Sequence, residues 1–214
     1  MEIPKEVEDA LRKEMHFPKK PMPQPAAFEV IAKAARSYSI SSDRLLFCWL
    51  YLTGQRITEA LQTYRRNVSK EEILGKNFLI VDSITLKNRQ QARRRIAIPM
   101  FGFESELTDF VWRTIEFLKP EARLFYFTRQ QAFNHLSRVQ VECEFIKSET
   151  KERFVSRHSI NPHYLRHCRA DHMAHNHGFD HVRLMQFFGW GSSAMPNTYI
   201  STSGRNLAEG FIHT

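Results

Sequence analysis

A short segment in the last third of the chain combines a histidine and an arginine in a way suited to holding an anion. The segment reads NPHYLRH, in which Asn161 is a candidate N-cap and Pro162 fits the first position of a helix. His163 and Arg166 are three residues apart, so a helix would place them on one face. Because the start of a helix carries partial positive charge, that face would attract an anion.

A second arginine, far upstream, has a similar setting. In TGQRITEAL, Gly54 interrupts a helical pattern, and Arg56 follows at the turn or in the first residues of the next helix. Glu59 stands three residues further on, where its carboxylate can orient the Arg56 guanidinium through a charge-assisted hydrogen bond. Each arginine taken alone could instead be an ordinary surface or ion-paired residue.

The elements that must position these residues are mostly helical. Apolar residues at helical spacing, with capping and breaking residues at the ends, predict most of the helices. They are expected over residues 26–37, from Ser41 or Ser42 through Leu50, from about Arg56 through Leu61, over 103–119, from Thr128 through Leu136, from Asn161 to Gly178, and over 180–188 before Gly189. Pro196 can begin a last short helix that carries Tyr199.

One region breaks the helical pattern. Between Phe78 and Pro99 the runs FLIV, SITL and RRIAIP are short and β-branched, with polar residues between them, which is typical of a small antiparallel sheet. Lys87 falls at the edge of its last turn. The expected fold class is therefore mainly α with a small antiparallel β-sheet.

Composition limits the possible partners. The 214 residues carry a formal net charge of +8, which favours a polyanion, either nucleic acid or an acidic membrane face. A membrane span needs about 20 apolar residues, and the longest strongly apolar run, Leu45 to Leu52, is much shorter. The charged start of the chain does not resemble a signal peptide. The three cysteines form no metal-type pair, so the reducing cytoplasm is the expected location.

Taken in order, these segments resemble the catalytic domain of the tyrosine recombinases, the phage integrase family. The matching pieces are TGQR with Glu59, a hairpin lysine at Lys87, HYLRH, GW at Gly189 and Trp190, and Tyr199 nine positions after Trp190. The resemblance runs from about Ala26 to Tyr199, and it implies a mostly helical domain with one small antiparallel sheet. Residues 1–25 would then be an arm or linker, 26–199 the catalytic domain, and 200–214 a C-terminal tail that packs in place or on a neighbouring protomer.

The resemblance also implies a role for each matching residue. Arg56 and Arg166 would hold the non-bridging oxygens of the scissile phosphate, and His163 would assist proton transfer. Tyr199 would be the nucleophile that becomes joined to the 3′ phosphate. Lys87 would protonate the leaving 5′ oxygen, Trp190 stands where the family has histidine or tryptophan, and Glu59 would support Arg56.

The chemistry suits these residue types. Charge gathers on the phosphate oxygens during attack, and two planar guanidinium groups can stabilise it. A free tyrosine has a pKa of about 10, so attack at neutral pH needs a base or cationic neighbours. Covalent attachment stores the energy of the broken phosphodiester bond, so no cofactor is expected.

Several features leave alternatives open. Tyr164 stands where the family commonly has aspartate, and residues 1–25 are too short for the separate N-terminal domain with which family members clamp DNA. Lys76 competes with Lys87 for the role of general acid. The crowded histidines could suggest a metal, but Tyr164 stands where a zinc protease has glutamate after its first histidine, so no metal site is expected. The basic hairpin residues are either a solvated face or phosphate contacts, and phosphate contact is the expectation for Arg89, Arg93, Arg94 and Arg95.

The resulting expectation is a site-specific recombinase or integrase that acts on double-stranded DNA, with several protomers, in a tetrameric synapse. Two alternatives share the same resemblance. A type IB topoisomerase would relax supercoils with a similar residue set, and a non-catalytic DNA-binding module would keep the fold without the reaction.

Overall fold

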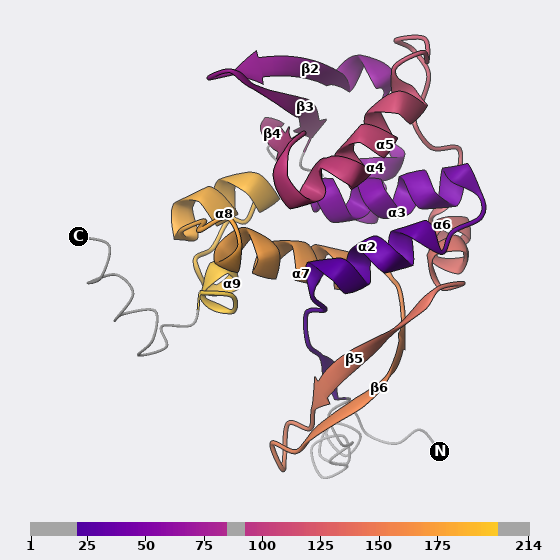
Figure 1. The fold of residues 1–214 in the computed structure, drawn as a ribbon. Coiled ribbons are helices and arrows are strands. Elements are labelled where there is room, and N and C mark those ends of the chain that lie inside the picture. The colour runs from indigo at the N-terminus through magenta and orange to yellow at the C-terminus, as the bar shows by residue number, and fades with distance from the viewer. Residues whose placement is uncertain (1–20, 85–92, 201–214) are drawn as a thin grey trace, which may run out of the picture.

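The computed structural model describes residues 21–84 and 93–200 (Figure 1). The helices are α2 (Phe28–Arg36), α3 (Ser41–Thr53), α4 (Ile57–Leu61), α5 (Ser105–Ile115), α6 (Arg129–Leu136), α7 (Pro162–His175), α8 (His181–Phe188) and α9 (Ala194–Asn197). The strands are β1 (Met22–Pro23), β2 (Val68–Ile73), β3 (Lys76–Ile84), β4 (Arg93–Pro99), β5 (Gln140–Ile146) and β6 (Arg153–Ser159).

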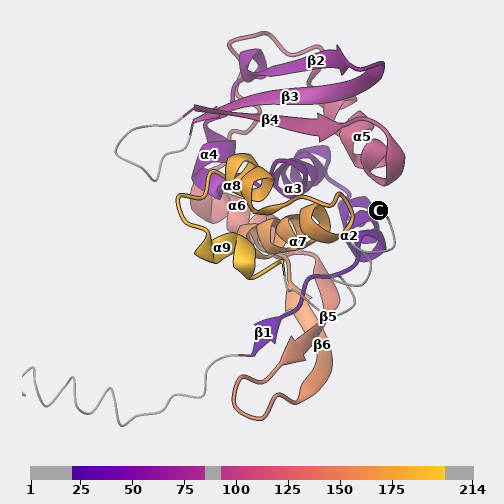
Figure 2. The ribbon, with the colours of Figure 1, turned by 90° about the vertical axis from the view of Figure 1, so that its left-hand side faces the viewer.

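Helix α3 is the centre of the fold. Its residues 45–53 are all buried, and it lies between the sheet that contains β4 on one side and α7 on the other (Figures 1 and 2). A helix that is apolar around its whole circumference needs partners on every side, and α3 packs against α5, α6 and α7. None of the helices within the described ranges has the length and apolar character that crossing a membrane requires.

Two small antiparallel sheets flank the helices. The strand order is β2-β3-β4 in one sheet and β1-β5-β6 in the other. Strand β4 alternates strictly, with Arg93 and Arg95 exposed and Arg94 and Ile96 buried. The β5–β6 hairpin projects from the helices on the side opposite the first sheet (Figures 1 and 2).

Most local signals for helix ends are confirmed. The Asn161 side chain accepts a hydrogen bond from the Tyr164 amide at the start of α7, with Pro162 as the first residue. Thr128 caps α6, and α8 ends at Gly189 in the left-handed conformation. The predicted serine cap of α3 is wrong, because Ile40 is the N-cap and no side chain bonds there.

The prediction of a mainly helical fold with a small antiparallel sheet is confirmed, with differences in extent. FLIV and the start of SITL form one strand, β3, so Ser83 does not begin a strand of its own. Strand β2 and the β5–β6 hairpin were not predicted, and α5 ends at Ile115 instead of Lys119. Residues 1–20 and 201–214, which hold most of the predicted arm and tail, lie outside the described residues.

A buried ion pair ties α7 to the segment before α5. Arg169 on α7 and Glu104 both have fully buried side chains, and an Arg169 Nη donates to a Glu104 carboxylate oxygen. His177 Nε2 lies 2.8 Å from the same oxygen. Burial alone would raise the pKa of Glu104, but Arg169 and His177 outweigh it and lower the pKa to about 2. The carboxylate therefore stays charged because its partners are buried with it.

Replacing Glu104 by glutamine should destabilise the fold strongly. Glu104→Gln leaves the Arg169 charge buried without a counter-ion, which costs on the order of 3–5 kcal/mol in comparable cases. The free energy of unfolding in urea measures the loss, and its difference from wild type should shrink as the pH falls from 4.5 towards 2, where Glu104 itself becomes protonated. The control Glu144→Gln removes an exposed partner of Arg153 and should cost about 1 kcal/mol or less. Equal losses for both variants would contradict this role for Glu104.

Candidate active site

An open cavity of about 470 Å³ collects most of the predicted site residues that the structure describes. It lies where the start of α4, the first turns of α7 and the segment after α8 meet. Its walls include Met22, Pro23, Arg56, His158, Asn161, His163, Tyr164, Arg166, His167, Trp190, Met195 and Tyr199. Residues from both ends of the chain therefore share one cavity.

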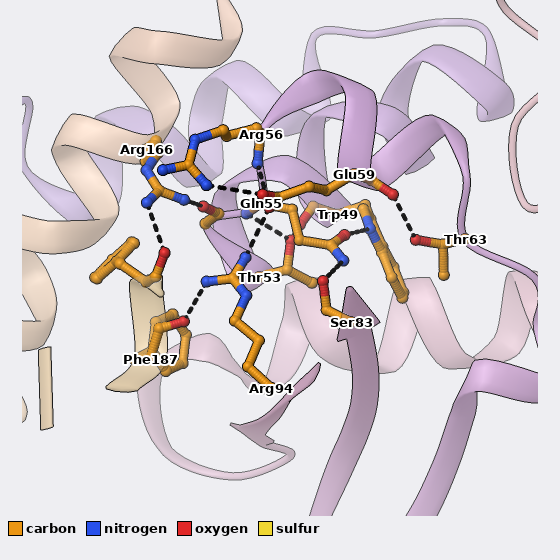
Figure 3. Close-up of polar contacts among 12 residues, drawn as sticks. Trp49, Thr53, Gln55, Arg56, Glu59, Thr63, Ser83, Arg94, Arg166 and Phe187 are labelled. Carbon is orange, nitrogen blue, oxygen red and sulfur yellow. Dashed lines mark hydrogen bonds and ion pairs between the residues drawn. The ribbon is translucent and has the colours of Figure 1, made fainter. Parts of the chain in front are cut away.

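The Gln55 side chain anchors the segment that carries Arg56. The buried Gln55 side chain accepts a hydrogen bond from Trp49 Nε1 at 2.7 Å and donates to Ser83 Oγ at 2.8 Å (Figure 3). Trp49 belongs to α3 and Ser83 to β3. These bonds fix the turn between α3 and α4, so the position of Arg56 depends on both the helical core and the sheet.

Glu59 links two arginines. Arg56 Nη1 donates to Glu59 Oε1 at 2.8 Å, and Arg94 Nη2 donates to Glu59 Oε2 at 2.9 Å (Figure 3). The Glu59 carboxylate is fully buried, whereas the Arg56 side chain is 28% exposed and faces the cavity. The carboxylate thus orients Arg56 as its spacing predicted.

Arg166 is buried and is held by backbone carbonyls. Its Nη1 donates to the Gly54 carbonyl oxygen, and its Nη2 donates to that of Phe188 at 2.8 Å. The guanidinium carbon lies 4.9 Å from the ring centre of Phe188 and 5.6 Å from that of Trp190. These contacts join the α3–α4 turn, α7 and the end of α8.

The cluster has excess positive charge. Arg56 and Arg94 both pair with Glu59, and the charges of these two arginines act on Arg166. Three guanidinium groups therefore lie near the Glu59 carboxylate. Burial, followed by the charges of Arg94 and Arg56, lowers the pKa of Arg166 to about 9. An anion in the cavity would relieve this repulsion, so the site favours a negatively charged ligand.

Tyr199 closes the other side of the cavity. It lies in the turn after α9 and is 8% exposed. Its ring stacks on Trp190 with centres 5.7 Å apart and planes 5° apart, and Trp190 in turn stacks on Phe188 at 4.6 Å. Burial raises the pKa of the Tyr199 hydroxyl to about 12, although the Arg166 charge acts in the opposite direction. The phenol is therefore protonated at neutral pH.

The two histidines on the exposed side of α7 differ in their contacts. His163 is exposed and lines the cavity, and its ring makes no hydrogen bond within residues 21–84 and 93–200. His167, one turn later, lies with Nδ1 3.0 Å from the Tyr199 hydroxyl oxygen. His167 is one of the crowded histidines considered above for a metal site, and its spacing of four from His163 places both on one helix face.

Arg94 departs from its expected position. It was grouped with the phosphate-contacting arginines of the hairpin, but its side chain points inward, where Nη1 donates to the Phe187 carbonyl at 2.5 Å and Nη2 pairs with Glu59. Alternate residues of a strand face opposite sides, so Arg93 and Arg95 point out when Arg94 points in. Arg95 also pairs with Glu71.

Other predicted residues are placed as follows. Lys87 and Arg89 lie outside the described residues. The competing lysine, Lys76, begins β3 and lies over the Phe101 ring, away from the residues that line the cavity.

Tyr164 is buried, and its hydroxyl contacts Cys143 Sγ and the Gln24 carbonyl. This tyrosine therefore ties α7 to β5 and to the segment after β1, which accounts for an apolar ring at that place. Within the described ranges, no three His, Cys, Asp or Glu side chains gather closely enough to hold a metal ion.

Comparisons with known proteins give a family match and several solved structures with a similar fold. The model of the phage integrase family matches residues 25–205. Among solved structures, the XerH site-specific recombinase bound to its palindromic difH substrate has a TM-score of 0.56 and 19% identity over 88% of this chain and 52% of its own. The XerA recombinase has a TM-score of 0.56 and 16% identity over 90% of this chain and 65% of its own. The Tn1549 transposon integrase in complex with transposon right end DNA has a TM-score of 0.54 and 17% identity over 95% of this chain and 69% of its own.

The chain thus spans about half the length of XerH. No curated protein sequence matches it.

The close packing of Gly54 makes a specific prediction about the site. Gly54 has φ +57°, and a Cβ there would lie 2.3 Å from Phe188 Cε1. Gly54→Ala should lower the free energy of unfolding by about 1 kcal/mol for the backbone conformation and by a further 1–3 kcal/mol for overpacking. Gly75→Ala is a matched control, because Gly75 has φ +74° and open space around it, and it should show only the first loss. Urea unfolding measures both, and equal losses would refute the close contact with Phe188.

Proposed function

The chain belongs to the phage integrase family, and from that premise we propose that it cleaves and rejoins DNA through a covalent 3′-phosphotyrosyl intermediate formed by Tyr199. Its substrate is double-stranded DNA, and the reaction is site-specific recombination or integration. One observation carries the proposal: Tyr199, Arg56, Arg166 and His163 line the same cavity, although up to 143 residues separate them along the chain, from 56 to 199.

The excess positive charge supports binding of the phosphate. Arg56 keeps donors free on the cavity side because Glu59 holds only part of its guanidinium. Arg166 is fixed by two carbonyl groups, so its remaining donors are oriented before DNA arrives. Donors that are already in place stabilise the charge that develops on the non-bridging oxygens without reorganising. In the proposal these two arginines hold the phosphate under attack.

The remaining roles follow the order of events. Tyr199 attacks phosphorus, the bond to the 5′ oxygen breaks, and that oxygen takes up a proton. Lys87 is the proposed donor of this proton, and His163, which faces the cavity, assists proton transfer at the phosphate. Trp190 stacks on Tyr199 and lies beside Arg166, so it positions the nucleophile against the cation. Rejoining reverses the steps, and no cofactor takes part.

Recombination needs more than one protomer. Two duplexes must each be cut and exchanged, and a tetrameric synapse is the proposed assembly, with residues 200–214 packing on a neighbouring protomer. The XerH and Tn1549 integrase structures contain DNA, and a similar DNA complex is proposed for this chain. Residues 26–199 would form its catalytic domain, preceded by an arm.

Covalent capture tests the proposal directly. A pool of end-labelled duplex oligonucleotides of randomised sequence, each with a nick, is incubated with the protein and resolved on a denaturing gel. A labelled protein–DNA adduct is expected, and Tyr199→Phe should abolish it because the ring remains but the nucleophilic oxygen is gone. Tyr126→Phe, which alters a tyrosine that is 79% exposed and outside the cavity, is the control and should leave the adduct unchanged.

The outcomes separate the alternatives. An absent adduct with the wild type, or an adduct that survives Tyr199→Phe, would refute the tyrosine mechanism, and DNA binding without an adduct would indicate a non-catalytic module. With an adduct established, sequencing the captured strands gives the cut site. Exchange between two such sites supports recombination, whereas relaxation of supercoiled plasmid without exchange would indicate a topoisomerase.

DNA binding should weaken steeply with salt. Several phosphates should be neutralised, and each contributes about −0.9 to the slope of log K against log salt concentration, so a slope of about −3 or steeper is expected. Arg93→Gln should reduce the magnitude of this slope by about 1. Arg113→Gln is the control, because exposed Arg113 lies on α5, outside the β2-β3-β4 sheet and the residues that line the cavity. Binding that is independent of salt would exclude the hairpin arginines as a contact surface.

A further inference from the structure

The Tyr199 hydroxyl has a specific partner that the roles above do not use. His167 Nδ1 lies 3.0 Å from the hydroxyl oxygen, and the two ring centres are 5.4 Å apart with planes inclined by 53°. The phenol can donate its proton to Nδ1 when the imidazole proton is on Nε2. No other hydrogen bond of this hydroxyl exists within the described part of the chain.

The contact is fixed from both sides. Trp190 stacks on the Tyr199 ring, so the phenol cannot easily rotate away from α7. His167 follows Arg166 directly on α7, and Arg166 is locked by two backbone carbonyls. The imidazole therefore lies beside the Tyr199 hydroxyl and lines the same cavity as Arg166.

A proton acceptor must be within hydrogen-bond reach of the proton that it removes. His167 meets this requirement, whereas His163 is exposed and makes no hydrogen bond with Tyr199 in the described part of the chain. On the basis of the proposed function, we propose that His167 is the catalytic base that accepts the Tyr199 proton during attack on the phosphate. His163 then keeps a separate role at the phosphate itself.

The Tyr199 O–H bond breaks as the bond from its oxygen to phosphorus forms, and the proton passes to His167 Nδ1, which becomes an imidazolium. The bond from phosphorus to the 5′ oxygen breaks, and the general acid protonates that oxygen. In the rejoining step the 5′ hydroxyl attacks phosphorus, and the imidazolium returns its proton to the leaving tyrosine oxygen.

The charges around His167 support this role. Burial lowers the pKa of His167, and the nearby Asp171 carboxylate on the same helix acts in the opposite direction. His167 is thus neutral at pH 7 and able to accept a proton. The other titratable or charged side chains that line the cavity are Arg56 from the α4 start, His158 from β6, Tyr199 after α9, and His163, Tyr164 and Arg166 from α7.

Proton transfer before DNA binds is unfavourable, because burial lowers the pKa of the acceptor and raises that of the phenol to about 12. Transfer becomes favourable only as the oxygen bonds to phosphorus and its charge moves onto oxygens held by Arg56 and Arg166. The free enzyme therefore keeps its nucleophile protonated.

The test compares wild type with His167→Asn. Asparagine can place a polar atom near the position of Nδ1 but cannot accept the proton at neutral pH. The substrate is a duplex that contains the cut site identified by the adduct assay. It is prepared in two forms, one with the ordinary 5′ oxygen at the cut site and one with sulfur in its place. A thiolate leaves without being protonated, so the sulfur substrate removes the need for a general acid and isolates activation of the nucleophile.

Wild-type cleavage in a single turnover should rise with pH through the lowered pKa of His167, below 6.5, and then level off. His167→Asn should be about 100-fold slower or more near neutral pH on both substrates, and its rate should keep rising up to at least pH 9. Asp171→Asn should shift the wild-type inflection to lower pH, because removing the carboxylate charge lowers the pKa of His167. Exposed His175 lies about two turns further along α7, and His175→Asn should retain the wild-type rate and levelled profile.

Three results would overturn the assignment. A His167→Asn rate within threefold of wild type, with an unchanged pH profile, would make His167 structural. Recovery of that variant on the sulfur substrate would make it an acid instead of a base. An inflection that Asp171→Asn leaves in place would assign the titration to another group. All three presuppose a wild-type adduct, so they are distinct from failure of the proposed function, in which the wild type itself forms none. Thermal unfolding of each variant checks that it is folded.

Discussion

The buried guanidinium of Arg166 is the contact on which the site depends. It donates to the Gly54 and Phe188 carbonyls and lies against the Phe188 and Trp190 rings, so a single side chain joins the α3–α4 turn, α7 and the end of α8. Helix ends leave carbonyl groups without partners, and Arg166 satisfies one at the end of α8. Arg94 does the same for Phe187. Arg166, which stabilises the fold in this way, thus also lines the cavity.

This arrangement concentrates positive charge at a cavity where an anion can bind. The Glu59 carboxylate pairs with Arg56 and Arg94, and burial together with repulsion from these two arginines lowers the pKa of Arg166. A fold with balanced charges would be easier to stabilise, but it would bind a phosphate less strongly. The aromatic stack of Phe188, Trp190 and Tyr199 extends from the same guanidinium to the phenol. The Arg166 guanidinium and the Tyr199 phenol are therefore positioned by one packing unit.

Local chemistry explains what the sequence could predict. Asn161, Pro162 and Gly189 signal helix ends through their own backbone preferences, and Glu59 lies within reach of Arg56 by helical spacing alone. The inward side chain of Arg94 was not predictable in this way, because it depends on which face of β4 meets the helices. The contact between His167 and Tyr199 depends on how the turn after α9 folds back on α7. The β5–β6 hairpin was missed although Gln140 to Phe145 alternates polar and apolar residues as a half-buried strand does, whereas β6 carries no such alternation.

The central claim is that two arginines and a tyrosine form a phosphate site before DNA arrives. The most direct measurement is an anomalous difference map from crystals of the protein soaked in tungstate, a tetrahedral anion. The account predicts a peak between the guanidinium groups of Arg56 and Arg166, with the Tyr199 hydroxyl oxygen on the same side of the cavity and within about 3–3.5 Å of the tungstate, the separation expected for reacting atoms. Tungstate bound elsewhere, with this cavity empty, would contradict it.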